Sequence, residues 1–469
     1  MDVLDALLQP LDGAIRVTGE KVTVPDEGAV RERMDWLIRE AVFGHRLTQE
    51  VARWLIWEMA QALEIRPASI YQLYMARGRE EISRPFTVPA LNLRMLAYDS
   101  ARAAFRAALG LNAGAVIFEL ARSEMGYTDQ RPSEYATAVL AAAIREGFRG
   151  PLFIQGDHFQ VSAKKYAADP EAEERAIRDL IVESIAAGFY NLDIDASTLV
   201  DLSRPSLEDQ QRQNYVLTAE LTKYIRQHEP EGITISVGGE IGEVGGRNST
   251  PEDLRAFMEG YCQLRGNVVG ISKISIQTGT SHGGVVLPDG TLAQVAIDFE
   301  ALRTLSEIAR REYGMAGAVQ HGASTLPEQA FGKFVEAGCC EVHLATAFQT
   351  LIFEHEAFSQ ALRESIYAWV QEHAAEERKP KDTEEQFLYR ARKRAVGPFK
   401  QQAWDLPEAG RAAIRKSLEE VFASLFERLA VSDTVDWVRQ FVKVPEIHRP
   451  LPATATEVQP AEVIEGLAD

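Results

Sequence analysis

Between Phe86 and Leu344 the chain alternates short apolar, strand-like segments with longer amphipathic, helix-like segments. The strand-like segments begin near residues 86, 114, 151, 188, 233, 268, 316 and 340. Strands that alternate with helices favour parallel pairing, and eight such units are typical of a closed (β/α)8 TIM barrel. A doubly wound open sheet is the alternative, but no Gly-x-Gly-x-x-Gly motif follows an early strand. We therefore predict an α/β fold of the barrel type.

The segments that flank this alternating region are helical in pattern. Residues 27–41 and 47–62 show the apolar spacing of helices, and residues 67–74 predict a further short helix with proline in its first turn. After about residue 350 the chain becomes charged, and residues 406–429 predict a long amphipathic helix. We expect an N-terminal helical extension at 1–84, the barrel at 85–349, helices packed on it at 350–449 and a disordered tail at 450–469.

Composition limits the classes of partner. The 469 residues carry a formal net charge of −19, which disfavours binding to nucleic acid or to an anionic membrane surface. No apolar stretch reaches the roughly 20 residues of a membrane helix, and the acidic N-terminus lacks the basic region of a signal peptide. The 3 cysteines, two of them adjacent, give no disulfide framework. We therefore expect a cytoplasmic protein.

Three histidines stand at the predicted ends of three separate strands. Asp157 and His158 follow the apolar segment 152–154, while His282 and His321 each precede a glycine. A single histidine in such a place is more often a surface or core residue, but barrel active sites lie at the carboxyl ends of the strands. Three imidazoles with an open fourth position indicate a catalytic zinc site, where the Asp157 carboxylate can move protons. The other polar residues at or near predicted strand ends are Asp195, Glu240 and His343.

Two basic features have both a structural and a functional interpretation. Lys273 lies inside a strand-like segment, where it is either a salt-bridged barrel residue or an anion contact. The basic cluster Arg392-Lys393-Arg394 is either a solvated helix face or an anion contact at the rim of an active site. We prefer the structural interpretation of Lys273.

Four motifs, together with their order and spacing, resemble those of class II, metal-dependent ketose-bisphosphate aldolases. The similarity extends from about Phe86 to about Leu429, and the segment around Asp195 also resembles the family's Asp-x-Ser segment. The motifs are Gly156-Asp157-His158, Gly239-Glu240-Ile241-Gly242 with Gly245-Gly246, Gly279-Thr280-Ser281-His282-Gly283, and His321-Gly322-Ala323-Ser324.

The resemblance implies a role for each matching residue. Asp157 would be the acid/base for the substrate's C4 hydroxyl, and a divalent metal would stabilise the enediolate left when the neighbouring bond breaks. The zinc ligands would be His158, His282 and His321, with Glu240 and Asp195 beside the metal. The phosphate contacts would be Gly283, Gly322, Ser324 and Thr346, with Lys273 as a substitute.

The departures from the family's pattern concern mainly the phosphate contacts. No lysine follows the His282-Gly283 motif, Ala121 stands at the position of a serine, and Arg247-Asn248 replaces an acidic pair. His343 stands where the family has a catalytic asparagine. An imidazole is larger than an amide and would crowd a C1 phosphate, so we expect that the best substrate is not fructose 1,6-bisphosphate.

The resemblance implies a zinc-dependent, cytoplasmic lyase of carbohydrate metabolism, such as glycolysis. It would cleave or form a carbon–carbon bond in a ketose phosphate or bisphosphate. A ketose 4-epimerase that uses the same retro-aldol step is the alternative. A non-catalytic, aldolase-like subunit is a third possibility, against which the histidines and Asp157 argue. We also expect a sugar or sugar-phosphate substrate, no nucleic-acid or membrane partner, and a homodimer or homotetramer.

Overall fold

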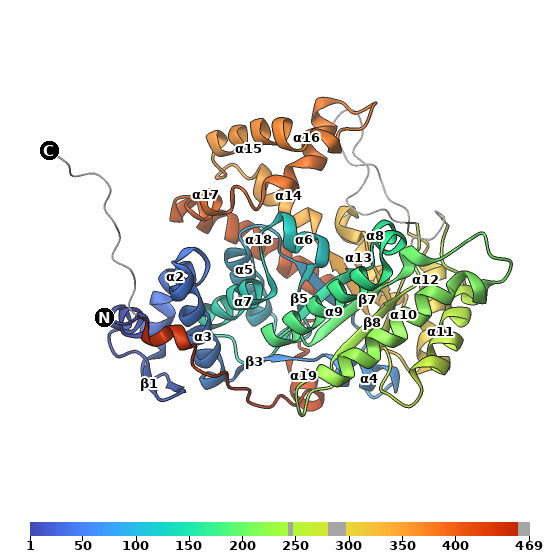
Figure 1. Cartoon of the computed structure of the whole chain (residues 1–469), viewed down its shortest axis with the longest axis horizontal. Helices are drawn as coiled ribbons and strands as arrows, with labels where there is room; N and C mark the ends of the chain where they lie inside the picture. Colours follow the sequence, from blue (N-terminus) through green and yellow to red (C-terminus); the bar gives the residue numbers. More distant parts are fainter. Residues whose placement is uncertain (243–246, 280–296, 458–469) are drawn as a thin grey trace. The chain divides into compact units, whose positions relative to one another are not determined.

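The computed structural model describes residues 1–242, 247–279 and 297–457 (Figure 1). The chain divides into two compact units, which are described separately. The first consists of Met1–Arg66, Thr137–Gly150 and Glu446–Asp469, and the second consists of Pro67–Ala136 and Pro151–Pro445. The part boundaries expected at residues 84, 349 and 449 stay predictions.

The second unit contains a closed parallel barrel. Its strands are hydrogen bonded in the order β6-β5-β4-β11-β10-β9-β8-β7, and a pairing of β6 with β7 closes the circuit. All of these pairings are parallel. The predicted α/β barrel is therefore confirmed, and the open-sheet alternative is wrong. The strands are β4 (Val88–Asn92), β5 (Ile117–Ala121), β6 (Gly150–Gln160), β7 (Asn191–Asp195), β8 (Ser236–Glu240), β9 (Lys273–Ile276), β10 (Ala318–Gln320) and β11 (Glu341–Leu344).

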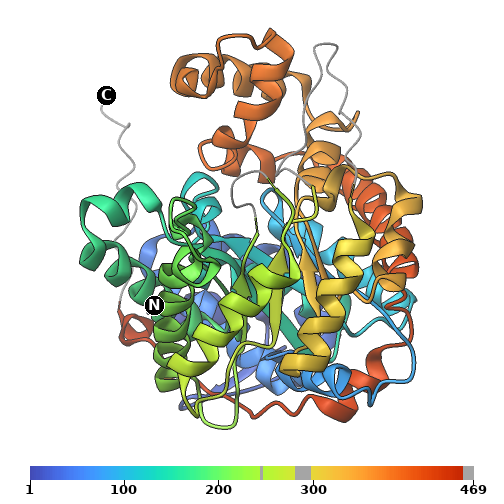
Figure 2. The same ribbon diagram turned by 90° about the vertical axis from the view of Figure 1, so that its right-hand side faces the viewer.

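Helices surround the barrel on its outside (Figure 2). The longer ones begin at a polar side chain that accepts a hydrogen bond from the first helical turn, such as Asp169 before α9 and Ser206 before α10. The helices of the second unit between β4 and the end of the barrel are α5 (Ala97–Gly110), α6 (Arg122–Tyr127), α8 (Ala163–Ala168), α9 (Pro170–Ala187), α10 (Leu207–His228), α11 (Pro251–Arg265), α12 (Phe299–Tyr313), α13 (Phe331–Glu336) and α14 (Thr346–Glu354). Most of the intervening helix α7 (Pro132–Glu146) belongs to the first unit.

The C-terminal part of the second unit is helical, as predicted, and its helices drawn in orange lie above one end of the barrel (Figure 2). The long helix expected at residues 406–429 is α18, and an ion pair between Asp99 and Arg411, 3.2 Å long, joins it to α5. The elements are α15 (Gln360–His373), α16 (Glu384–Ala391), the 3₁₀-helix η6 (Arg392–Ala395), α17 (Lys400–Trp404), α18 (Glu408–Arg428) and α19 (Val435–Phe441).

The first unit is built on two helices, α2 (Glu27–Phe43) and α3 (Arg46–Ala62), close to the predicted ranges. The C-terminal segment packs on α3, where Trp57 Nε1 donates to the carbonyl of Ile447 at 2.7 Å. The described part of the expected tail contains a 3₁₀-helix, Ala453–Thr456, and residues 458–469 lie outside the described residues. The unit also contains α1 (Val3–Leu8) and an antiparallel pair that the sequence analysis missed, β1 (Arg16–Thr18) and β2 (Lys21–Thr23).

The helix predicted at residues 67–74 is wrong in its start. Ile65–Ala68 form strand β3, which pairs with β6 outside the closed circuit, and helix α4 runs over Tyr71–Gly78. Pro67 therefore lies in an edge strand, where its missing N–H costs no ladder hydrogen bond. Proline has a place at both edge strands and helix starts, so the residue alone did not decide between them.

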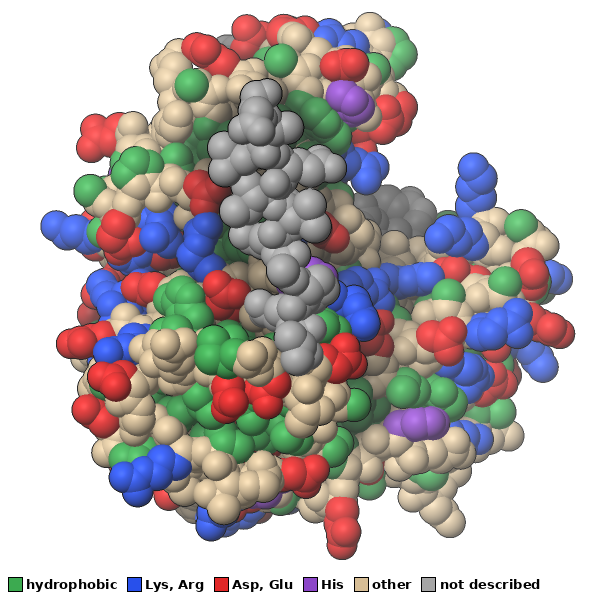
Figure 3. All heavy atoms as spheres, turned by 60° about the vertical axis from the view of Figure 1, so that its left-hand side comes forward, with side chains coloured by type: hydrophobic (Ala, Val, Ile, Leu, Met, Phe, Trp, Pro, Cys, Tyr) green, Lys and Arg blue, Asp and Glu red, His purple; other side chains and the backbone are tan. Residues whose placement is uncertain are grey.

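Charged side chains of both signs are mixed on one face of the molecule. On the face drawn in Figure 3, Lys and Arg side chains lie among Asp and Glu side chains rather than in one basic field. Among the described residues, no helix combines the length and the apolar character needed to span a membrane.

Candidate active site

A β-bulge in β6 directs Asp157 and His158 into one cavity. The register between β6 and β7 shifts between Gly156 and Phe159, and His158 has a φ of 39°. In a regular strand these neighbours would face opposite sides, whereas a bulge re-aims side chains. A Cβ added at Gly156 would lie 2.4 Å from Phe159 Cε1, so glycine leaves the space that the ring occupies. A non-glycine residue in this left-handed region is strained, which is common at functional sites.

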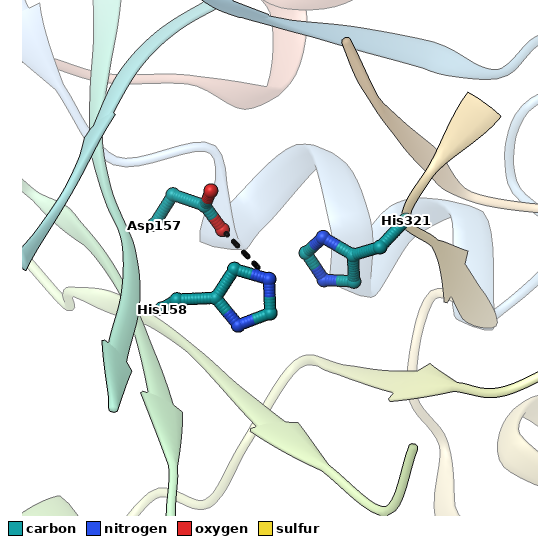
Figure 4. A group of neighbouring side chains, drawn as sticks. All are labelled: Asp157, His158 and His321. Carbon is teal, nitrogen blue, oxygen red and sulfur yellow. Dashed lines mark ion pairs between the residues drawn. The ribbon is translucent and has the colours of Figure 1, made fainter. Parts of the chain in front are cut away.

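The two described histidines of the predicted metal site lie side by side. The rings of His158 and His321 are 4.1 Å apart between centroids and face each other from β6 and the end of β10 (Figure 4). His158 Nδ1 lies 3.2 Å from Asp195 Oδ2 and 3.2 Å from Glu240 Oε2. Burial alone would lower the pKa of His158, but Asp157 and Glu240 outweigh it and raise that pKa well above its usual value.

These side chains fit a divalent cation. Ligand atoms of Asp157, His158 and His321 all lie within 4.8 Å of one another, as do those of His158, Asp195 and Glu240. Imidazole and carboxylate are ligands that Zn²⁺ accepts, and carboxylates from three strands supply the negative charge that a buried dication needs. The geometry therefore supports His158 and His321 as metal ligands, with Asp195 and Glu240 beside them.

His343, at the end of β11, is surrounded by buried carboxylates. Its Nδ1 lies 3.0 Å from Glu119 Oε2 and 3.2 Å from Asp157 Oδ1, while its Nε2 lies 2.6 Å from Glu341 Oε1. Burial alone would lower the pKa of His343, but Glu119 and Asp157 raise it well above its usual value. Burial and the nearby Asp157 raise the pKa of Glu119 to about 7. The imidazole thus neutralises part of a dense negative charge beside Asp157.

Lys273 belongs to the same buried network. Its side chain is 1% exposed, and its Nζ lies 2.9 Å from Asp193 Oδ2, donates to Gln155 Oε1 at 2.8 Å and pairs with Glu341. A Cβ added at Gly238 would lie 2.3 Å from Asp193 Oδ1 and 3.0 Å from Lys273 Cε, so glycine makes room for this pair. Lys273 does not line the cavity. Of its two interpretations, the structure supports the salt-bridged barrel residue rather than the anion contact.

Asp157, His158 and His321 border a cavity of about 990 Å³. Its strand-end wall includes Ala121, which is the predicted replacement for a serine. The predicted phosphate contacts Gly322, Ser324 and Thr346 line it too, and Ser324 Oγ accepts a hydrogen bond from the Ala345 N–H at 2.8 Å. The C-terminal part of the second unit completes the cavity with Lys379 and Asp382 from the loop before α16, and with Gln386, Tyr389, Arg390 and Lys393 from α16 and η6.

Three other residues from the sequence analysis are not part of the described cavity. His282 and Gly283, expected to bind the metal and the phosphate, lie outside the described residues. Arg247, which replaces an acidic residue of the family's pattern, is not in the cavity lining but pairs with Asp253 at 2.6 Å.

Sequence reasoning missed three buried acids, although a signal for them exists. Glu119, Asp193 and Glu341 each stand two residues before a strand-end position that was singled out, namely Ala121, Asp195 and His343. Residues two apart on a strand share a face, so each acid points into the barrel beneath its neighbour.

The family model for fructose-bisphosphate aldolase class-II matches residues 82–422. The chain belongs to the class II fructose-bisphosphate aldolase family. The buried histidine and carboxylate clusters are consistent with the metal site typical of class II aldolases.

Two solved structures match this chain at low sequence identity. The fructuronate-tagaturonate epimerase of Cohnella laeviribosi is 14% identical, with a TM-score of 0.51 over 92% of this chain and 90% of that chain. The fructose-bisphosphate aldolase of Campylobacter jejuni is 18% identical, with a TM-score of 0.45 over 78% of this chain and 94% of that chain. The likeness to the epimerase shows a common architecture that extends beyond the part matched by the family model.

Proposed function

We propose that this class II aldolase family member is a Zn²⁺-dependent enzyme that cleaves or forms a carbon–carbon bond in a ketose or ketose phosphate. The observation that carries this proposal is the bulge in β6. It sets the buried carboxylate of Asp157 directly beside His158 and in the same cavity as His321. A base next to a cation site is the combination that retro-aldol cleavage requires.

Each residue has a defined task in the proposed reaction. His158 and His321 would hold the cation, with His282 as the third proposed ligand. When bound, the cation supplies Lewis-acid stabilisation of the negative charge that develops on the enediolate oxygens. Asp157 would take the proton from the hydroxyl on the carbon whose bond breaks, and return it when the bond forms. His343, with Nδ1 3.2 Å from Asp157 Oδ1, would orient that carboxylate.

His343 also bears on the substrate. Its nitrogens face Glu119, Glu341 and Asp157, so the position of the family's asparagine carries an imidazole embedded in negative charge. A phosphate beside the carbonyl would meet these carboxylates, and Ala121 offers it no hydroxyl. We therefore propose a ketose without a C1 phosphate as the preferred substrate.

A ketose 4-epimerase is the second candidate. It would break the same bond, turn the aldehyde fragment over and re-form the bond. The cavity favours this possibility because helices of the same chain form its outer wall, which would retain the fragment. The epimerase of Cohnella laeviribosi, of similar architecture, acts on fructuronate and tagaturonate by its name.

Turnover with product identification tests both candidates. The Zn²⁺-loaded full chain is incubated with fructose, fructose 6-phosphate, fructose 1,6-bisphosphate and fructuronate, and products are followed by NMR. Shorter fragments indicate an aldolase, whereas a six-carbon epimer without fragments indicates the epimerase. Activity that survives both chelation and Asp157→Asn would contradict the proposed mechanism. A wide preference for the bisphosphate that His343→Asn leaves unchanged would contradict the proposed substrate.

A further inference from the structure

The buried acid Glu341 lies behind His343 rather than in the cavity. Both residues belong to β11, and because they are two positions apart, their side chains share one face of the strand. Asp157 and His343 line the cavity, whereas Glu341 is not among the described residues that do, and its side chain is fully buried. Any effect of Glu341 on a substrate in this cavity must therefore pass through a neighbouring side chain.

The imidazole of His343 connects this buried acid to the proposed base. Its Nε2 lies 2.6 Å from Glu341 Oε1, and its Nδ1 lies 3.2 Å from Asp157 Oδ1. A ring that turned over would place carbon atoms against these oxygens, so an acceptor at each nitrogen fixes its orientation. A buried acid that orients a histidine, which in turn acts on a reacting group, is the arrangement of a catalytic triad.

The carboxylate of Glu341 is itself held from several sides. Tyr74 Oη donates to its Oε2, whereas Gln155 Nε2 donates to its Oε1 at 2.9 Å and Lys273 pairs with the same oxygen. These contacts keep Oε1 directed at His343 Nε2. Site residues need such support, because locked neighbours hold them within about 0.5 Å of the productive geometry.

A purely structural role for Glu341 would be to neutralise Lys273. Lys273 has a second acid for this purpose, since its Nζ lies 2.9 Å from Asp193 Oδ2. Asp193 does not replace Glu341 beside the imidazole, because its Oδ2 lies 3.8 Å from His343 Nε2. Of these two acids, Glu341 is therefore the one close enough to hold the ring.

We propose that Glu341 is a positioning residue, which holds the His343 imidazole so that it orients the carboxylate of Asp157 for proton transfer. The inference rests on the proposed function and adds to it a residue that the substrate does not touch. Loss of an outer partner that orients a site residue costs roughly 10–100-fold in activity at metal sites, and we expect an effect of this size.

Steady-state kinetics of the Zn²⁺-loaded full chain tests this role. On whichever of fructose, its two phosphates or fructuronate the wild type converts, Glu341→Met should lower kcat roughly 10–100-fold and leave KM and zinc content unchanged. Glu341→Gln keeps an oxygen that can accept from Nε2, so it should retain part of the turnover. Asp99→Asn is the control and should keep the wild-type kcat. Asp99 is also buried and pairs with Arg411 at 3.2 Å, but it lies outside the described cavity lining.

A double-mutant cycle shows whether Glu341 acts through His343. Glu341→Met should cost roughly tenfold or more in the wild type, but less than about twofold in a His343→Asn background, which has no ring to hold. The inference is overturned if the cost is the same in both backgrounds or if Glu341→Met has the kcat of the wild type. An equal loss of kcat in Asp99→Asn overturns it too, because any buried carboxylate would then have this effect.

Crystal structures give a readout that does not depend on turnover. Glu341→Met leaves Lys273 its pair with Asp193, so the variant should fold. If it does not, Glu341→Gln, which has the shape of glutamate, takes its place under the same criteria. The His343 ring should turn so that Nδ1 leaves Asp157 Oδ1, and a ring that stays 3.2 Å from this oxygen overturns the inference. A displaced ring in a protein whose wild type lacks retro-aldol activity would refute the proposed function but keep Glu341 as the residue that holds His343.

Discussion

The barrel interior and the C-terminal wall of the cavity handle buried charge in opposite ways. Inside the barrel, Lys273 pairs with Asp193 and Glu341, and His343 lies among Glu119, Asp157 and Glu341. On the wall, Lys393 has no acidic partner among the described residues. In the interior each of these two cations has at least two acidic partners, whereas on the wall Lys393 has no ion pair with a described residue.

This contrast bears on which region carries the chemistry. Paired charges in a dry interior fix side-chain positions, because each group loses much if its partner is removed. No ion pair with a described residue fixes Lys393 in this way. The interior would thus carry the chemistry.

The largest expected effect tests where the chemistry lies. Asp157→Asn keeps the shape of the side chain but cannot act as a base, so turnover should fall by about 10²–10⁴-fold on every substrate, anionic or neutral. Metal content and the melting temperature should stay close to those of the wild type. Steady-state kinetics with zinc analysis measures this, and near-normal turnover would show that another group moves the proton.

The second effect compares the stability of the two regions. Lys273→Met leaves Asp193 and Glu341 buried without their cation, which should cost about 3–5 kcal/mol of unfolding free energy. Lys393→Met removes the same functional group from the wall and should cost none. Urea denaturation of both variants gives the comparison. The double variant Lys273→Met/Glu341→Gln should recover part of the loss, and equal destabilisation by the two lysine variants would refute the contrast.

The sequence was sufficient for the barrel and for its strand-end residues. Apolar segments locate parallel strands, and the barrel rule then brings Asp157, His158, His321 and His343 together. The sequence was insufficient for the buried ionic network inside the barrel. In the sequence, Glu119 only interrupts the apolar segment of β5, and nothing indicates that it pairs with His343.

The ion-pair partners of the charged side chains could be identified only from the three-dimensional structure. The role of Lys273 depends on Asp193 and Glu341, which lie 80 and 68 residues away in the sequence. Lys393 differs from Arg392 and Arg394 because those two arginines form ion pairs with Glu354 and Glu377. The bulge in β6 also depends on the packing of Phe159 over Gly156. No local sequence pattern predicts that packing.

A third, smaller effect tests how tightly the interior is packed. Gly238→Ala would place a methyl group 2.3 Å from Asp193 Oδ1, so the Lys273 pair must shift, at about 1–3 kcal/mol. Gly28→Ala makes the same chemical change in the exposed first turn of α2 and should be neutral or stabilising. Thermal unfolding of the two variants measures the difference. A Gly238→Ala protein as stable as the wild type would mean that the interior pair is loosely held.

The smallest expected effect comes from an ion pair at the surface, which serves as a reference for both regions. Burial alone would raise the pKa of Asp253, but hydrogen bonds from Arg247 and Thr250 outweigh it and hold the pKa below its usual value. A carboxylate with a lowered pKa in the folded state stabilises the fold above its unfolded-state pKa, and that contribution is lost as the pH falls through the folded-state pKa. Because Arg247 is 44% exposed, water screens the pair, and its contribution should be about 1 kcal/mol or less.

Arg247→Met should therefore lower the unfolding free energy slightly at pH 7, and the difference from the wild type should vanish in acid below the Asp253 pKa. A difference at pH 7 as large as that of Lys273→Met would show that burial does not set the value of an ion pair in this protein.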